Sequence, residues 1–98
     1  MMELNYSPRD IKEIEDVSKK PLTDTIADFS MKTIELFVRK GLKVDEETAL
    51  NEIEKYLDEG NDTMALYILI MEKLQSRGFL PKALKIDELK KKMENLEV

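Results

Sequence analysis

The sequence predicts an all-α fold: a single small helical domain of four to six short helices, with an amphipathic C-terminal helix. Apolar residues recur at spacings of three and four along most of the 98 residues, as on the buried side of a helix. Three glycines, Gly41, Gly60 and Gly78, each follow such a segment, where a left-handed residue commonly ends a helix. We expect a helical core domain over residues 1–80, and a linker with a basic amphipathic helix over residues 81–98.

The first helix is expected to begin at Ser7. Ser7 can cap the free amides of the first turn, Pro8 suits the first helical position, and Asp10 completes a pattern like a capping box. Leu4 and Tyr6 precede this helix and alternate with polar residues. That alternation predicts a short extended arm lying on the core.

The middle of the chain contains further helix boundaries. Pro21 is expected to end the first helix, because the residue before proline disfavours helical geometry. Residues 22–29 then form a second helical piece, and Ser30 can cap the apolar segment that follows. The pattern leaves open whether these two pieces are one kinked helix or two helices. Schellman-type ends are predicted at Gly41 and Gly78.

Asp45 is expected to cap an acidic helix. Its predicted core residues are Leu50, Ile53, Tyr56 and Leu57. Against the single Lys55, its remaining positions carry six acids: Glu46, Glu47, Glu52, Glu54, Asp58 and Glu59. Such a charge pattern is typical of a solvated face, and a surface for a basic partner is the alternative interpretation.

Asp62 is expected to cap the most apolar helix of the chain. Residues 64–71 are all apolar, and a helix that is apolar all round is buried all round. This helix is then either the central helix of the domain or is covered on one side by a partner. If it is incompletely covered, Tyr67, Ile70 and Met71 are candidate partner contacts.

Residues 81–98 form the basic end of an acidic protein. They carry five lysines and an apolar stripe, which is our first candidate for a partner-binding surface: Leu84, Ile86, Leu89, Met93 and Leu96. A helix of about three turns is marginal in water unless it docks. It docks either on its own domain or on another molecule.

Composition argues against most chemistry. Without cysteine or histidine, the chain lacks the usual thiolate and imidazole ligands and nucleophiles, so we expect no metal, cofactor or catalytic site. The net charge of -5 argues against nucleic acid and anionic membranes as partners. Separately, we expect a cytoplasmic location. Asp24, Asp28 and Glu35 are the least implausible acids for catalysis, although charges near a helix start explain them more simply.

The order of these segments resembles a known family. The segments that carry the resemblance are, in chain order, Asp10-Ile11-Lys12-Glu13-Ile14-Glu15, Lys20-Pro21-Leu22, Ile34-Glu35-Leu36 leading to Gly41-Leu42, an acidic helix, and Leu74 before Gly78-Phe79. This order is similar to that of the tail assembly chaperones of long-tailed phages and prophages of Gram-positive bacteria. The resemblance spans roughly residues 4 to 79. It consists of hydrophobic and capping positions and contains no catalytic signature.

The resemblance implies a non-enzymatic protein that binds the tape-measure protein before tail assembly and helps recruit tail-tube subunits. Such a protein acts in the host cytoplasm and is absent from the finished virion. Apart from the resemblance, we expect that this chain can form a homo-oligomer. The competing hypothesis is a small acidic all-helical regulatory or inhibitor protein that binds one folded host or bacterial protein through its acidic face. Strong salt dependence of binding would distinguish this alternative.

Overall fold

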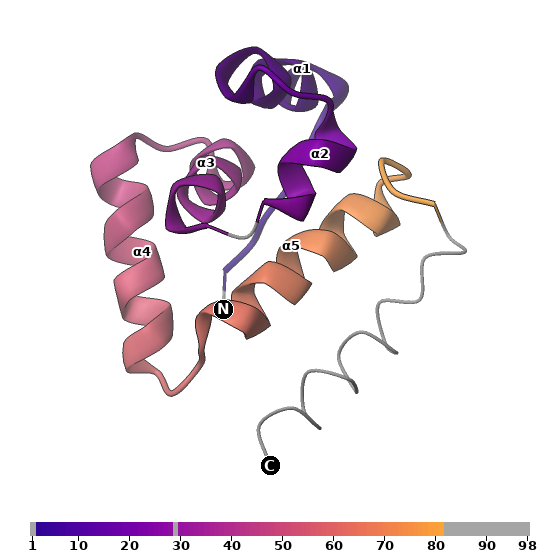
Figure 1. Cartoon of the computed structure of the whole chain (residues 1–98). Coiled ribbons are helices and arrows are strands. Elements are labelled where there is room, and N and C mark those ends of the chain that lie inside the picture. The colour runs from indigo at the N-terminus through magenta and orange to yellow at the C-terminus, as the bar shows by residue number, and fades with distance from the viewer. Residues whose placement is uncertain (1, 29, 82–98) are drawn as a thin grey trace.

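The computed structural model describes residues 2–28 and 30–81 and confirms the all-α class (Figure 1). The described part has five helices: α1 (Pro8–Ser18), α2 (Leu22–Ala27), α3 (Met31–Leu42), α4 (Glu46–Asp58) and α5 (Thr63–Ser76). α3 packs against α1, α4 and α5, and its residues 33–38 are all buried. The central helix is therefore α3, and not α5 as its apolar composition had suggested. The predicted C-terminal helix lies outside the described residues.

The predicted helix starts are confirmed. Ser7 and Asp10 form a reciprocal capping box with Pro8 at the first helical position, and Ser30 accepts a hydrogen bond from the Thr33 amide. Asp45 and Asp62 cap α4 and α5, accepting from backbone amides at 2.8 and 2.7 Å. α2 and α3 are two separate helices, because the chain leaves helical geometry between Ala27 and Ser30. The carboxylate of Glu15 in α1 accepts a hydrogen bond from the Leu22 amide at the start of α2.

The glycines have two different roles. Gly60 and Gly78 have positive φ, and α5 ends in the predicted Schellman pattern, with the amide of Phe79 donating to Leu74 at 2.9 Å. The predicted helix end at Gly41 is wrong. α3 continues through Leu42, and Lys43 takes the left-handed conformation instead. Gly41 is needed for a different reason, which is the close approach of the N-terminal arm.

Residues 2–6 form the predicted extended arm on the core. The side chains of Met2, Leu4 and Tyr6 are buried, while those of Glu3 and Asn5 are exposed. The Asn5 amide donates to the Gly41 carbonyl at 3.0 Å. A Cβ at Gly41 would lie 2.8 Å from Leu4 Cδ2 and 2.9 Å from the Tyr6 hydroxyl oxygen. The arm can therefore lie this close to α3 only because residue 41 has no side chain.

Tyr6 is the deepest residue of the arm. Its hydroxyl donates to the Phe37 carbonyl at 2.7 Å, and its ring meets the Phe37 ring edge to face. Arg77, at the end of α5, donates to the Tyr6 carbonyl at 3.0 Å. Burial raises the pKa of Tyr6, and the nearby Asp10 carboxylate raises it further. The arm thus joins α3 to the end of α5.

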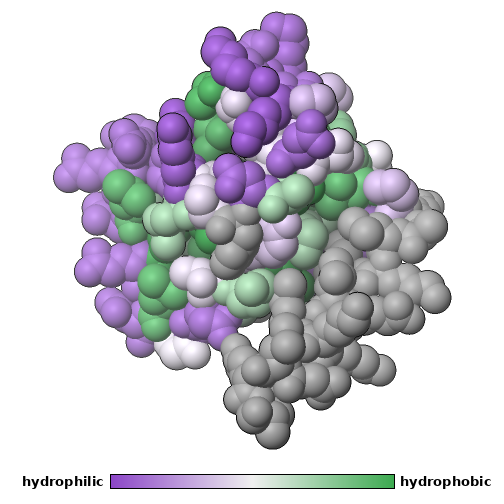
Figure 2. Space-filling model, in the orientation of Figure 1, coloured by the Kyte–Doolittle hydropathy of each residue, from purple (hydrophilic) through white to green (hydrophobic). Residues whose placement is uncertain are grey.

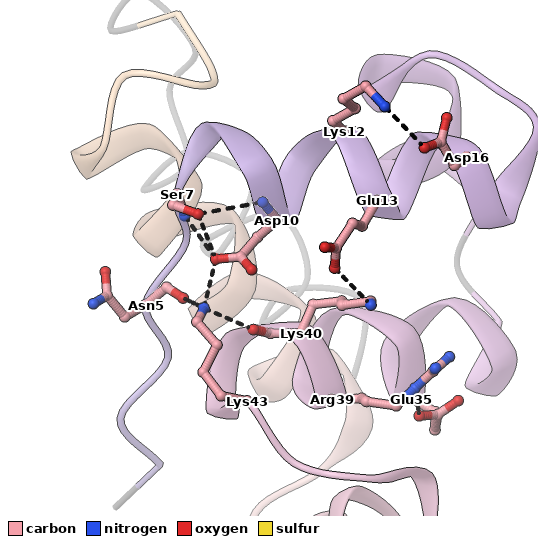
Figure 3. A network of polar contacts seen from close by, with 10 residues as sticks. All are labelled: Asn5, Ser7, Asp10, Lys12, Glu13, Asp16, Glu35, Arg39, Lys40 and Lys43. Atoms are coloured by element: carbon pink, nitrogen blue, oxygen red, sulfur yellow. Dashed lines mark hydrogen bonds and ion pairs between the residues drawn. The ribbon is translucent and has the colours of Figure 1, made fainter.

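A polar network next to the arm joins α1 to α3 (Figure 3). The Asp10 carboxylate accepts hydrogen bonds from the amide and hydroxyl of Ser7 and from the Lys43 ammonium. Lys43 also donates to the Asn5 carbonyl at 2.7 Å, and Lys40 pairs with Glu13 at 2.8 Å. Burial alone would raise the pKa of Asp10, but the hydrogen bonds from Lys43 and Ser7 lower it below its usual range. Asp10 is therefore a buried, charged link between three segments.

Gly41→Ala tests the role of the close approach. Alanine is the better helix former by up to about 1 kcal/mol, but crowding a packed core costs about 1–3 kcal/mol. Since the neighbouring Leu4 and Tyr6 side chains are buried, we expect a lower free energy of unfolding in urea. Combining Gly41→Ala with Leu4→Ala should cost less than the sum of the two single changes. A neutral or stabilising Gly41→Ala would contradict this account.

The lowered pKa of Asp10 predicts that the folded domain loses stability in acid. Because its pKa is lower in the folded chain, Asp10 contributes stability above the unfolded value of about 4, and this contribution is lost as the pH falls through the folded pKa. Asp10→Asn should therefore be less stable at neutral pH and lose less stability on acidification. Urea unfolding from pH 7 to pH 2 measures both effects. Asp16→Asn, whose ion pair with Lys12 is exposed, is the control and should follow the wild-type profile.

Candidate partner-binding surface

The first predicted partner surface lies outside the described residues. Its five members, Leu84, Ile86, Leu89, Met93 and Leu96, all follow Pro81. This surface stays a prediction. The described chain does fix where the segment begins, because the Gln75 side-chain amide donates to the Pro81 carbonyl at 3.0 Å. Leu80 is buried directly before it. Residues 82–98 therefore start beside the last turn of α5.

The second predicted surface is not accessible in this structure. These residues were candidates only if the helix is incompletely covered. Ile70 and Met71 are buried in the core, so α5 is covered at both positions. Tyr67 is partly buried, and its hydroxyl donates to the Ile26 carbonyl of α2. Burial raises the pKa of Tyr67. These three side chains pack α5 into the domain and do not present a surface to a partner.

Among the described residues, three large hydrophobic side chains are exposed. Val17 of α1 is 52% exposed, Met31 of α3 is 44% exposed, and Leu50 of α4 is 42% exposed. The prediction that Leu50 belongs to the core is wrong. On α4, Ala49 and the predicted Ile53 are the buried residues, and this helix packs against α3. The small Ala49 gave only a weak sequence signal for this packing.

Leu50 lies among carboxylates that have no cation partner. One helical turn away on either side are Glu46, Glu47 and Glu54, all exposed. The five ion pairs of the described chain all join side chains between Asp10 and Lys43. Within the described residues, no carboxylate on α4 forms an ion pair. The outer face of α4, defined here as Glu46, Glu47, Leu50, Glu54 and the partly buried Leu57, is an apolar strip bordered by uncompensated negative charge.

The surface view agrees with this description. In Figure 2, hydrophobic surface interrupts the hydrophilic surface on the side of the molecule where Figure 1 places α4. At the other end of α4, burial raises the pKa of Tyr56, and the carboxylates of Asp62 and Glu59 raise it further. The negative charge of the two residues that follow α4 is therefore felt at Tyr56. Such a face favours a partner that brings both apolar and cationic side chains.

The candidate catalytic acids do not converge. Asp24 is exposed, Asp28 pairs with Lys20 at 3.8 Å, and Glu35 pairs with Arg39 at 2.8 Å. Asp28 and Glu35 line one groove of about 430 Å³ between α1, α2 and α3, together with lysine and arginine side chains. Each is therefore paired with a cation, whereas acid–base catalysis by two carboxylates needs them to perturb each other.

Two further features were searched for within the described residues. No group of three acidic side chains there could hold a metal ion. No helix in that part of the chain combines the length and apolar character needed to cross a membrane.

The exposure of Leu50 can be tested by mutation. Leu50→Gln should change the free energy of unfolding by no more than about 0.5 kcal/mol, because both residues are good helix formers and the site is solvated. Ile53→Ala, one turn away and buried, should cost about 2–4 kcal/mol. Urea unfolding of the two variants measures the contrast. Equal losses would show that Leu50 belongs to the core after all.

Comparison of the chain with protein-family models, with curated proteins and with solved structures finds no match. The functional argument therefore rests on this chain's own residues and on the sequence resemblance described above.

Proposed function

We propose that the protein is a non-enzymatic phage or prophage tail assembly chaperone. It binds the tape-measure protein in the host cytoplasm, keeps the helices of this client soluble, and helps recruit tail-tube subunits. The observation that supports the proposal best is that apolar residues of the segments that carry the resemblance are buried. Ile11, Ile14, Ile34, Leu36 and Leu74 are buried, so the pattern describes the packing of a fold and not an isolated motif.

The arrangement of the apolar residues is consistent with this role. The described domain uses the apolar side chains of α5 for its own core. A client must therefore be held by other apolar positions, and the stripe over residues 84–96 supplies them in the sequence. An adaptable surface suits a client that is itself a set of amphipathic helices, and Met93 adds a flexible side chain to it.

A second candidate function is favoured by a different observation. The unpaired carboxylates of α4 could bind a basic patch on one folded protein, as a small acidic inhibitor or regulatory protein does. Salt distinguishes the two, because a complex formed mainly by exposed charges weakens steeply as ionic strength rises. Binding of apolar client helices should survive the same salt.

Co-expression with the tape-measure protein from the same genome tests the proposal. The tagged full-length chain should keep this client soluble and co-purify with it at both low and high salt. Leu89→Asp combined with Met93→Asp should abolish co-purification, because charged residues interrupt the stripe. Val17→Asp, which alters an exposed apolar residue elsewhere, should have no effect. An insoluble, unbound client would refute the chaperone proposal, and binding lost only at high salt would favour the acidic regulatory protein.

A further inference from the structure

We infer that the groove between α1, α2 and α3 binds a free α-amino acid that has an apolar side chain. The groove has a volume of about 430 Å³, within the range of roughly 300–1,000 Å³ that small-molecule pockets have. The inference goes beyond the proposed function, because holding a client requires no small ligand. Three observations lead to it: a buried carboxylate with one open oxygen, an arginine that this carboxylate orients, and two opposite charges without partners.

One face of α3 forms the floor of the groove. Four residues at helical spacing line it from this face: Lys32, Glu35, Leu36 and Arg39. Leu36 supplies apolar surface there, and the exposed Val17 adds more from the end of α1. The apolar side chain of a ligand therefore has surface to contact beside the charged groups.

Glu35 is the buried charge of this floor. Its side chain is 10% exposed, and its Oε2 accepts a hydrogen bond from Nε of Arg39 at 2.8 Å (Figure 3). The other oxygen, Oε1, accepts no hydrogen bond from the described residues, and it is not sealed from solvent. A carboxylate oxygen at this depth binds a charged donor strongly, because hydrogen bonds gain strength where water is scarce. The open oxygen of Glu35 thus favours a ligand with an ammonium group.

Glu35 also fixes the orientation of Arg39. The hydrogen bond at Nε leaves the two terminal nitrogens of the guanidinium, Nη1 and Nη2, which donate to no described residue. Such a planar pair of donors matches the two oxygens of a carboxylate. An acceptor and a pair of donors therefore lie side by side in the groove. The ammonium and carboxylate of an α-amino acid are adjacent in the same way.

The remaining charges of the groove favour a zwitterion. Lys32 at the start of α3 and Glu46 at the start of α4 form no ion pair within the described residues. Glu46 and Arg39 line both this groove and the adjoining one, so Glu46 lies at the Arg39 end. Lys20 and Asp28 pair with each other at 3.8 Å, so the groove has no net charge. A ligand that carries both signs is therefore more complementary to it than an ion of one sign.

NMR titration of the full-length, isotope-labelled chain with L-leucine tests the inference. Amide shifts in α3 and at the start of α4 should saturate with a dissociation constant of about 1 mM or below. Leucinamide, which has no carboxylate, and N-acetyl-leucine, which has no ammonium, should each bind at least about tenfold more weakly. Glycine, which has no apolar side chain, should also bind more weakly. Absence of saturation at about 20 mM leucine, or equal affinity for the three leucine compounds, would overturn the inference.

Two variants and a matched control make the test specific to the groove. Glu35→Gln should weaken leucine binding at least about tenfold, because the amide oxygen can still accept from Arg39 but the ammonium loses its charged partner. Glu46→Gln alters an exposed residue, so it should preserve the fold and weaken leucine binding about threefold. Glu47→Gln removes the same charge from the next residue, which does not line the groove, and should bind leucine as the wild type does. Leucine binding that Glu46→Gln leaves unchanged would overturn the inference, whether or not Glu35→Gln folds.

Discussion

The approach of the N-terminal arm to the backbone of α3 determines how the domain is assembled. At Gly41 the arm lies so close that a single methyl group would overlap it, and from there Tyr6 reaches the Phe37 carbonyl. The same residue accepts a hydrogen bond from Arg77 at the end of α5. Five residues of extended chain thereby hold the central helix and the last described helix in place. A small domain with one core gains much from such a strap, because each helix alone buries little surface.

The ion pairs are unevenly distributed along the described chain. The ion pairs of the described chain all lie between Asp10 and Lys43, and two of them, Glu13 with Lys40 and Asp10 with Lys43, join α1 to the C-terminal end of α3. A buried carboxylate such as Asp10 needs a cation close to it, here Lys43, because a buried charge without a partner lowers the stability of the fold. The acids of α4 are solvated and carry no such requirement. The ion pairs thus gather in the N-terminal half, whereas the carboxylates of α4 form none within the described residues.

The sequence predicted local features better than features that depend on contacts between distant residues. Ser7, Ser30, Asp45 and Asp62 were recognised as caps because capping depends on a few neighbouring residues. Gly41 was misread, since a glycine required by close packing has the same local surroundings as one that ends a helix. Leu50 was misplaced because the rotation of α4 depends on the fit of Ala49 against the core. The exposure of Leu50 could not be found from periodicity alone, because periodicity places this leucine on the apolar face of α4.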